Sequence, residues 1–243
     1  MCGNETARST RTQAEVYEEF FVPALFQQWG GVVASLAGVG PNQCVLDVAC
    51  GTGVLACAAA DRVGPGGSVV GLDPNEEMLA VARRKNSAIE WRAGRAESLP
   101  FSGESFDAVV SQFGFMFFGD RRAALREMMR VLRPGGHLVV AVCDALGNSP
   151  GYAAFAELLR RLFGDRVANA FHAPFVLGDR QLLFSLCADA GIFDAKIARH
   201  DGMVRFASIQ SLVSTERACA WTLGGILDDA QFDQLLRASE QEL

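Results

Sequence analysis

Residues 45–56 read VLDVACGTGVLA, an apolar run with one acidic residue that passes through a glycine turn into a helical pattern. Such a unit predicts the strand, turn and helix that open an α/β domain. Gly51 and Gly53 carry no Cβ, so the backbone of this turn can approach a ligand closely. Asp47 disfavours a pyrophosphate, which binds bare N–H groups at a helix N-terminus. It favours a cation such as the ammonium of an amino-acid tail, although a carboxylate held by nearby backbone amides is the alternative.

A second acidic residue follows at the end of the next apolar run. Asp73 stands in residues 71–74, GLDP, 22 residues after Gly51. An acid at this distance from a glycine turn suits ribose hydroxyls. A nucleoside that lacks phosphate and carries a cationic amino-acid arm is S-adenosylmethionine. The two acids therefore predict S-adenosyl-L-methionine as cofactor and S-adenosyl-L-homocysteine as product.

Four further segments follow in order: GLDPNEEML at 71–79, GRAESLPF at 94–101, FDAVVSQFGFMFF at 106–118 and REMMRVLRPGGHLVVAV at 126–142. With residues 45–56 they resemble the signatures of class I S-adenosylmethionine-dependent methyltransferases. The likeness is to the small-molecule branch (methyltransferase type 11) that includes quinone-biosynthesis enzymes. The resemblance implies an α/β fold with a doubly wound, mostly parallel sheet, the Rossmann-like methyltransferase fold, together with a helical cap.

The alternation of apolar runs and turn signals divides the chain into four predicted regions. These are an N-terminal helical lid segment at 1–40, a cofactor-binding α/β core at 41–145, a helical cap insertion at 146–178, and a C-terminal part of the core with terminal helices at 179–243.

Within these regions, strands are predicted at Cys44–Val48, Ser68–Leu72, Ile89–Ala93, Asp107–Phe113 and His137–Cys143. A hairpin is predicted from Ala195–His200 and Met203–Phe206 across Asp201-Gly202. Asp73 is expected to cap the helix that starts at Pro74.

Composition limits the classes of function. The chain has 243 residues and a net charge of −6, so it lacks the broad basic field that attracts nucleic acid. Its seven cysteines form no Cys-x-x-Cys pair and have no histidine at ligand spacing, so we expect no metal site and a reducing, cytoplasmic setting. No apolar run approaches the roughly 20 residues that span a membrane, and we expect no membrane partner. The oligomeric state stays open.

The resemblance carries over to a set of residues expected to contact the cofactor. Tyr17 is similar to an N-terminal aromatic residue that closes over it. Relatives have an aspartate that binds the adenine amino group where this chain has Arg95, and arginine cannot accept that hydrogen bond. Glu97 or the backbone around Ala96 would take over. The full set is Tyr17, Asp47, Ala49, Cys50, Gly51, Gly53, Asp73, Pro74, Met78, Arg95, Ala96, Glu97, Gln112, Phe113 and Phe117.

Gln112 ends the fourth predicted strand, where sheets of this kind bind ligands. Enzymes that methylate amino groups of bases carry Asn/Asp-Pro-Pro-aromatic there, so residues 111–114, SQFG, disfavour that activity. The aromatic run at 113–118 could line a pocket for an apolar acceptor or pack under the next helix. Among the histidines only His172 is considered as a general base.

The predicted reaction is in-line methyl transfer to a small, partly apolar molecule. Alignment of the reactants can contribute about 7–11 kcal/mol, against about 3–5 kcal/mol for a general base. An NAD(P)-dependent oxidoreductase is one alternative, because Gly51-x-Gly53-x-x-Ala56 also matches a dinucleotide fingerprint. A non-catalytic protein that binds S-adenosylmethionine is another. Whether oxygen, nitrogen, carbon or sulfur is methylated stays open.

Overall fold

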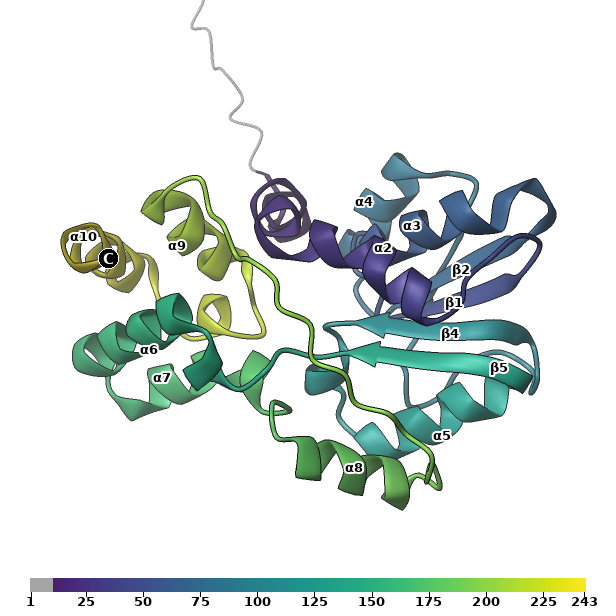
Figure 1. Cartoon of the computed structure of the whole chain (residues 1–243). Coiled ribbons are helices and arrows are strands. Elements are labelled where there is room, and N and C mark those ends of the chain that lie inside the picture. The colour runs from purple at the N-terminus through teal and green to yellow at the C-terminus, as the bar shows by residue number, and fades with distance from the viewer. Residues whose placement is uncertain (1–10) are drawn as a thin grey trace, which may run out of the picture.

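The fold is built around a parallel sheet, seen in a computed structural model that describes residues 11–243 (Figure 1). The first ten residues of the predicted lid segment lie outside the described residues. The sheet has five strands in the order β3-β2-β1-β4-β5. These are β1 (Cys44–Val48), β2 (Ser68–Asp73), β3 (Glu90–Ala93), β4 (Phe106–Gln112) and β5 (Leu132–Ala141). All neighbouring strands are parallel, and each overlaps a predicted strand, although β5 begins at Leu132, five residues before the predicted start at His137.

β1 is the central strand, and the strand order reverses between it and β4. Val45, Leu46 and Val48 are fully buried, as expected for a strand that is covered on both faces. Helices α2 (Gln27–Leu36) and α3 (Val54–Val63) cover one face of the sheet, and α5 (Arg121–Val131) covers the other (Figure 1). Ligands of doubly wound sheets bind beyond the carboxyl ends of the strands at such a reversal. The fold therefore places the site at the ends of β1 and β4.

The N-terminal helical region contains a wide turn around its proline. α1 (Gln13–Val16) leads into η1 (Tyr17–Phe26), a π-helix, and then into α2. Pro23 inside η1 lacks the N–H for an ordinary helical bond, and its ring would clash with the carbonyl four residues earlier. The wider π turn accommodates it without ending the helix. Tyr17 and Phe26 stand at the two ends of this segment.

The cap of α4 (Glu76–Lys85) differs from the prediction. Asn75, not Asp73, is the N-cap residue, and its Oδ1 accepts hydrogen bonds from the N–H groups of Glu77 and Met78 at 2.9 and 3.4 Å. Pro74 precedes the helix instead of starting it. The Asp73 carboxylate is already engaged by the N–H groups of Gly51 and Asn75, both at 2.8 Å. It therefore belongs to the glycine turn rather than to the helix.

Four helices form a cap with its own core beyond the carboxyl ends of the strands (Figure 1). They are α6 (Pro150–Phe163), α7 (Asp165–Phe171), α9 (Ile209–Ala218) and α10 (Asp229–Glu242). Phe155, Phe171 and Phe232 are almost fully buried at its centre. α8 (Arg180–Asp189) packs against the apolar surface of α5 instead. Residues 209–243 therefore lie with α6 and α7.

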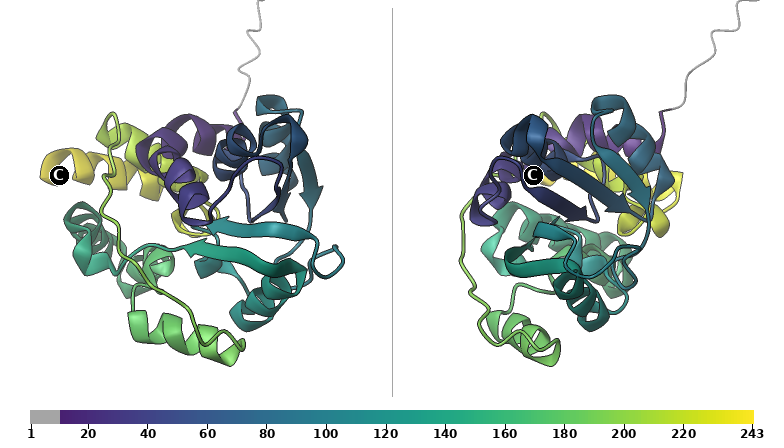
Figure 2. Two further views of the ribbon diagram at one scale, coloured as in Figure 1. Left: turned by 45° about the vertical axis from the view of Figure 1, so that its right-hand side comes forward. Right: turned by 90° about the vertical axis from the view of Figure 1, so that its right-hand side faces the viewer.

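The predicted hairpin in the C-terminal region is wrong. Residues 192–208 run as one extended segment along the outside of the molecule, and none of them is in a strand (Figures 1 and 2). Met203 exchanges two hydrogen bonds with the Gln28 side chain, at 2.7 and 3.1 Å. A Cβ on Gly202 would lie 2.2 Å from the Trp29 ring. The glycine thus permits close packing on α2 instead of a reversal of the chain.

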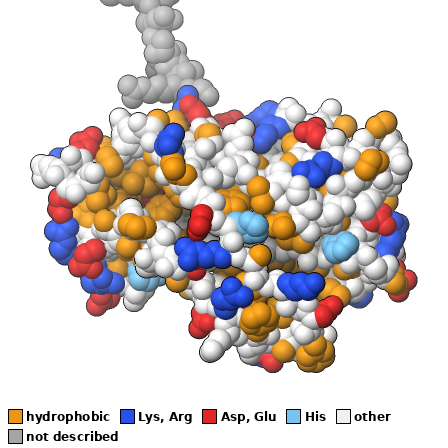
Figure 3. All heavy atoms as spheres, in the orientation of Figure 1, with side chains coloured by type: hydrophobic (Ala, Val, Ile, Leu, Met, Phe, Trp, Pro, Cys, Tyr) orange, Lys and Arg blue, Asp and Glu red, His pale blue; other side chains and the backbone are white. Residues whose placement is uncertain are grey.

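The surface carries charged side chains of both signs, intermixed over the face drawn in Figure 3. Apolar side chains are visible on the same face between α9 and α6. Within residues 11–243, no helix combines the length and the apolar character needed to cross a bilayer.

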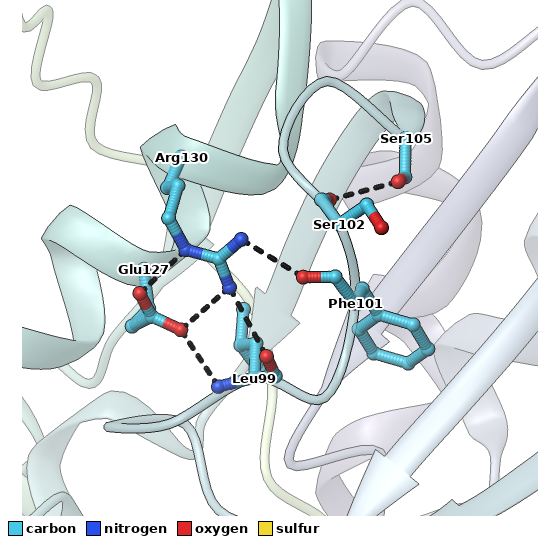
Figure 4. A network of polar contacts seen from close by, with 6 residues as sticks. All are labelled: Leu99, Phe101, Ser102, Ser105, Glu127 and Arg130. Atoms are coloured by element: carbon cyan, nitrogen blue, oxygen red, sulfur yellow. Dashed lines mark hydrogen bonds and ion pairs between the residues drawn. The ribbon is translucent and has the colours of Figure 1, made fainter.

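Glu127 and Arg130 on α5 hold the loop between β3 and β4 (Figure 4). Arg130 donates to the backbone carbonyls of Leu99 and Phe101 at 3.0 and 2.8 Å. Glu127 accepts from the Leu99 N–H at 2.8 Å and pairs with both Nε and Nη2 of Arg130. This network fixes the loop that contains Arg95 and Glu97 against the helix.

Replacing Arg130 should therefore cost more stability than replacing an arginine of similar exposure. We expect Arg130→Met to lower the free energy of unfolding by about 1 kcal/mol, because two backbone carbonyls lose their donor. Arg83→Met removes one exposed ion pair with Glu76 and should cost at most a few tenths of a kcal/mol. Urea unfolding of the two variants measures the difference. Equal costs would contradict a structural role for the network.

Candidate active site

A small polar cavity lies at the carboxyl ends of β1 and β4. Its volume is about 30 Å³. Strand β1 and the glycine turn form its floor, and η1 closes the opposite side. The lining residues are Tyr17, Phe26, Asp47, Ala49, Cys50, Gly51, Thr52, Val54, Leu55 and Gln112.

Several oxygen atoms that line the cavity receive no hydrogen bond from the described residues. Both carboxylate oxygens of Asp47, Oγ1 of Thr52 and Oε1 of Gln112 are buried and have no hydrogen-bond partner among the described residues. The amide nitrogen of Gln112 donates to the Phe26 carbonyl at 3.0 Å, which turns its Oε1 away from that carbonyl. Buried acceptors without donors are costly. Their common need is a ligand that donates several hydrogen bonds, and an ammonium group has three donors.

Among these side chains, Asp47 has the least favourable electrostatic environment for its charged form. Its side chain is 1% exposed. Burial raises the pKa of the Asp47 carboxyl well above its usual range, and the negative charge of Asp73 adds to the shift. The nearby Ala56 N–H lowers the pKa of Asp47 and so opposes this shift. It forms no hydrogen bond with the carboxylate, because both Asp47 oxygens lack a partner among the described residues. A cation placed in the cavity would favour the ionised form. Backbone amides of the described residues therefore do not hold the Asp47 carboxylate by hydrogen bonds, contrary to the alternative considered above.

Asp73 links the end of β2 to the glycine turn. Each of its oxygens accepts one backbone hydrogen bond, from Gly51 and from Asn75. Burial raises its pKa, while these two N–H groups lower it. A carboxylate oxygen can accept more than one hydrogen bond. Asp73 therefore positions the turn and keeps acceptor capacity for hydroxyl groups.

The two glycines of the turn meet different surroundings. Gly51 lines the cavity with φ +54°, and a Cβ on it would approach only the Tyr17 hydroxyl, at 4.0 Å. A Cβ on Gly53, which has φ +87°, would lie 2.4 Å from the Trp91 ring. Ala49 is also left-handed, with φ +59°. Backbone strain of this kind is concentrated at functional sites. Gly51 thus serves the cavity, and Gly53 serves the packing of Trp91.

The residues expected near adenine lie outside the polar cavity. Glu97 accepts through Oε1 from the Gly119 N–H at 2.8 Å and pairs with the exposed Arg95 at 3.3 Å. Ala96 is buried in the core beneath α5. Met78 packs with Ala14 and Tyr17, and Pro74 is exposed.

A second, mostly apolar cavity of about 50 Å³ adjoins the first, and Phe26 lines both. Aromatic side chains make up most of its wall, including Phe113 and Phe117 from the predicted run. Phe115 from the same run packs against Leu125 and Leu177 instead. The lining residues are Phe21, Leu25, Phe26, Phe113, Met116, Phe117, Cys143, Tyr152, Phe171, Pro174, Phe175, Glu216, Cys219, Trp221 and Thr222.

Comparison with known proteins agrees with this geometry. Residues 46–140 match a family described as a methyltransferase domain. A ubiquinone/menaquinone biosynthesis C-methyltransferase, UbiE, of Bordetella parapertussis is 32% identical over 201 residues, which cover 77% of this chain and 78% of the relative. The chain belongs to the class I S-adenosylmethionine-dependent methyltransferases that act on small molecules.

Other relatives of the methyltransferase have related names. A demethylmenaquinone methyltransferase of Renibacterium salmoninarum is 41% identical over 135 residues, which cover 56% of this chain and 56% of the relative. The chain therefore spans about half the length of this relative. A S-adenosylmethionine-dependent methyltransferase of Aquifex aeolicus, a solved structure, has a TM-score of 0.54 at 17% identity over 81% of this chain and 95% of that one. This last likeness supports the fold alone.

Sequence reasoning did not single out several residues that line the methyltransferase's two cavities. Phe26 contributes to both walls from η1, and Tyr152 and Glu216 contribute to the second wall from helices about 100 residues or more after the glycine turn. One sequence signal could have indicated Glu216. It is an acidic residue that follows the apolar Leu212 and Val213 at helical spacing, which places it on the apolar face of a helix. His172 follows α7, and its buried Nε2 has no partner among the described residues, but it does not line either cavity.

Proposed function

We propose that this chain binds S-adenosyl-L-methionine in the polar cavity and transfers its methyl group to a small aromatic molecule in the apolar one. The cofactor supplies an activated methyl group on a cationic sulfur, with a neutral thioether as leaving group. The protein has to align the acceptor and exclude water.

The unpartnered acceptors around Asp47 carry this proposal. The cofactor's ammonium would donate to Asp47, Gln112 and Thr52, and so satisfy oxygens that otherwise lose hydrogen bonds on folding. Asp73 would accept from the ribose hydroxyls. Tyr17 stacks on Phe26 with ring centroids 5.3 Å apart and would close the methionine side of the site.

The adenine contact is proposed to use the backbone around Ala96 and the remaining oxygen of Glu97. Arg95 pairs with Glu97 and would face solvent from there, since its side chain is 68% exposed. Residues Ala49, Cys50 and Gly51 would lie along the cofactor's amino-acid arm.

The apolar cavity supports an acceptor with a flat ring. Phe113, Phe117 and Trp221 offer ring faces and edges to it, and aromatic pairs of this kind favour offset or edge-on contacts. The relatives' names refer to quinone biosynthesis, and a quinol or naphthol would match the size and polarity of such a wall.

Calorimetry with S-adenosylmethionine, S-adenosylhomocysteine and NAD tests the cofactor assignment. We expect binding of the first two and none of NAD, because the Asp47 carboxylate would repel a pyrophosphate. Transfer of labelled methyl groups to a panel of naphthols, quinols and amines then tests the reaction. Binding of NAD alone would overturn the proposal, and cofactor binding without transfer to any acceptor would indicate a regulatory protein.

A further inference from the structure

We propose that Glu216 is the proton acceptor of the reaction, and that the methylated molecule is an aromatic compound with an ionisable hydroxyl group. This inference rests on the proposed function, because it assigns the apolar cavity to the methyl acceptor. It adds a catalytic residue that lies on α9, far from the cofactor signatures.

Glu216 is a carboxylate placed in an aromatic cavity. Its side chain is 3% exposed, yet it lines the cavity with Phe117 and Trp221. Oε2 accepts a hydrogen bond from the Thr222 hydroxyl at 3.1 Å, which orients the carboxylate. No basic side chain among the described residues forms an ion pair with it. Burying a carboxylate in such surroundings without an ion pair costs folding free energy. This cost indicates that Glu216 has a functional role.

The charge of Glu216 changes in the physiological range. Burial raises its pKa to about 7, and the hydrogen bond from Thr222 opposes the shift. The other titratable groups of the cavity wall are Tyr152, Cys143 and Cys219, and burial raises the pKa of each further above neutrality. A base works best when its pKa is near the operating pH. Glu216 is therefore the wall residue able to take a proton at neutral pH.

Tyr152 provides a second polar contact for a hydroxyl-bearing acceptor. Its hydroxyl is buried and has no partner among the described residues. It lies on α6, and its ring meets Phe175 with centroids 5.6 Å apart. An acceptor hydroxyl could accept from Tyr152 while it donates to Glu216. The rest of the wall would hold the aromatic ring.

The proposed step balances in charge and in atoms. The acceptor's O–H bond breaks and the proton goes to a Glu216 oxygen. The electron pair of the acceptor, on oxygen or on a conjugated ring carbon, forms the new bond to the methyl carbon. The bond between sulfur and that methyl carbon breaks, and its electrons remain on sulfur. One carboxylate and one sulfonium become a neutral acid and a neutral thioether, a change that a low-dielectric cavity favours.

Transfer kinetics of Glu216→Gln test the assignment, with saturating S-adenosylmethionine and two acceptors. With 1-naphthol, whose hydroxyl is protonated at neutral pH, we expect kcat/KM to fall by about 100-fold or more. With 4-nitro-1-naphthol, which is largely ionised at neutral pH and keeps a free ring carbon beside the hydroxyl, it should change only a few-fold. The wild-type pH profile for 1-naphthol should rise through about pH 7, in line with the pKa of Glu216, and this inflection should disappear in the variant.

Controls separate this inference from the cofactor assignment. Glu216→Gln should bind S-adenosylhomocysteine as the wild type does, whereas failure of the wild type to bind it would overturn the proposed function instead. If Glu216→Gln does not fold, Thr222→Val decides, because loss of its hydroxyl should move the inflection to higher pH. Equal losses with both naphthols, an inflection unchanged in either variant, or wild-type transfer to amines and thiols alone would overturn the role of Glu216.

Discussion

Asp47→Asn is expected to abolish most cofactor binding while it stabilises the free protein. The asparagine removes the negative charge that would pair with the cofactor's ammonium. Loss of one partner of a buried charge pair costs about 2–5 kcal/mol, so the affinity for S-adenosylmethionine should fall by about 30-fold or more. Calorimetry at neutral pH measures this loss. Asp61→Asn, an exposed change on α3, should leave affinity unaltered.

The gain in stability follows from the pKa of Asp47. Its folded-state pKa lies well above the unfolded value of about 3.9. Between these two pKa values the folded state holds the proton more tightly, so stability falls as pH rises through that range. Replacing the titratable carboxyl should therefore raise the free energy of unfolding at neutral pH. The gain should shrink as the pH is lowered toward 5; a destabilised variant would contradict an unpaired carboxylate.

Gly53→Ala is expected to destabilise the fold strongly. A left-handed φ costs a side chain about 1–2 kcal/mol, and the new Cβ would also lie 2.4 Å from Trp91. Overpacking of this kind adds about 1–3 kcal/mol. The expected total is about 2–5 kcal/mol, measured by urea or thermal unfolding.

Gly191→Ala is the matched control. Gly191 has a nearly identical φ of +89°, and a Cβ on it would meet nothing within 4 Å. It should therefore cost only the backbone part, about 1–2 kcal/mol. In a Trp91→Ala background the two glycine substitutions should cost the same. If Gly53→Ala stays more costly there, contact with Trp91 is not the cause.

The strand order's central unit and the position of Asp47 at the end of β1 could be predicted because they are local in sequence. Strand β1, the glycine turn and Asp47 lie within 13 consecutive residues, 44–56, and their pattern follows from burial and turn chemistry. The helical character of the N-terminal segment was also predicted. Its π-helical form was not, because it depends on how the chain accommodates the proline ring.

The remaining features depend on tertiary contacts that have no local pattern. Asp201-Gly202 has a hairpin signal, yet Gly202 is needed for its approach to Trp29. Asp73 is a residue type that can cap a helix, but its carboxylate instead accepts a hydrogen bond from the Gly51 N–H. Glu216 enters the apolar cavity from a helix more than 150 residues after the glycine turn. Such contacts are set by the packing of the cap, which no short motif encodes.

The central claim is that the Asp47 carboxylate receives the cofactor's ammonium. A double-mutant cycle tests it most directly, with S-adenosylhomocysteine and its analogue lacking the α-amino group, each bound to the wild type and to Asp47→Asn. We predict that loss of the amino group weakens binding to the wild type by about 30-fold or more, and binding to the variant only slightly. The same loss in both proteins would contradict the account.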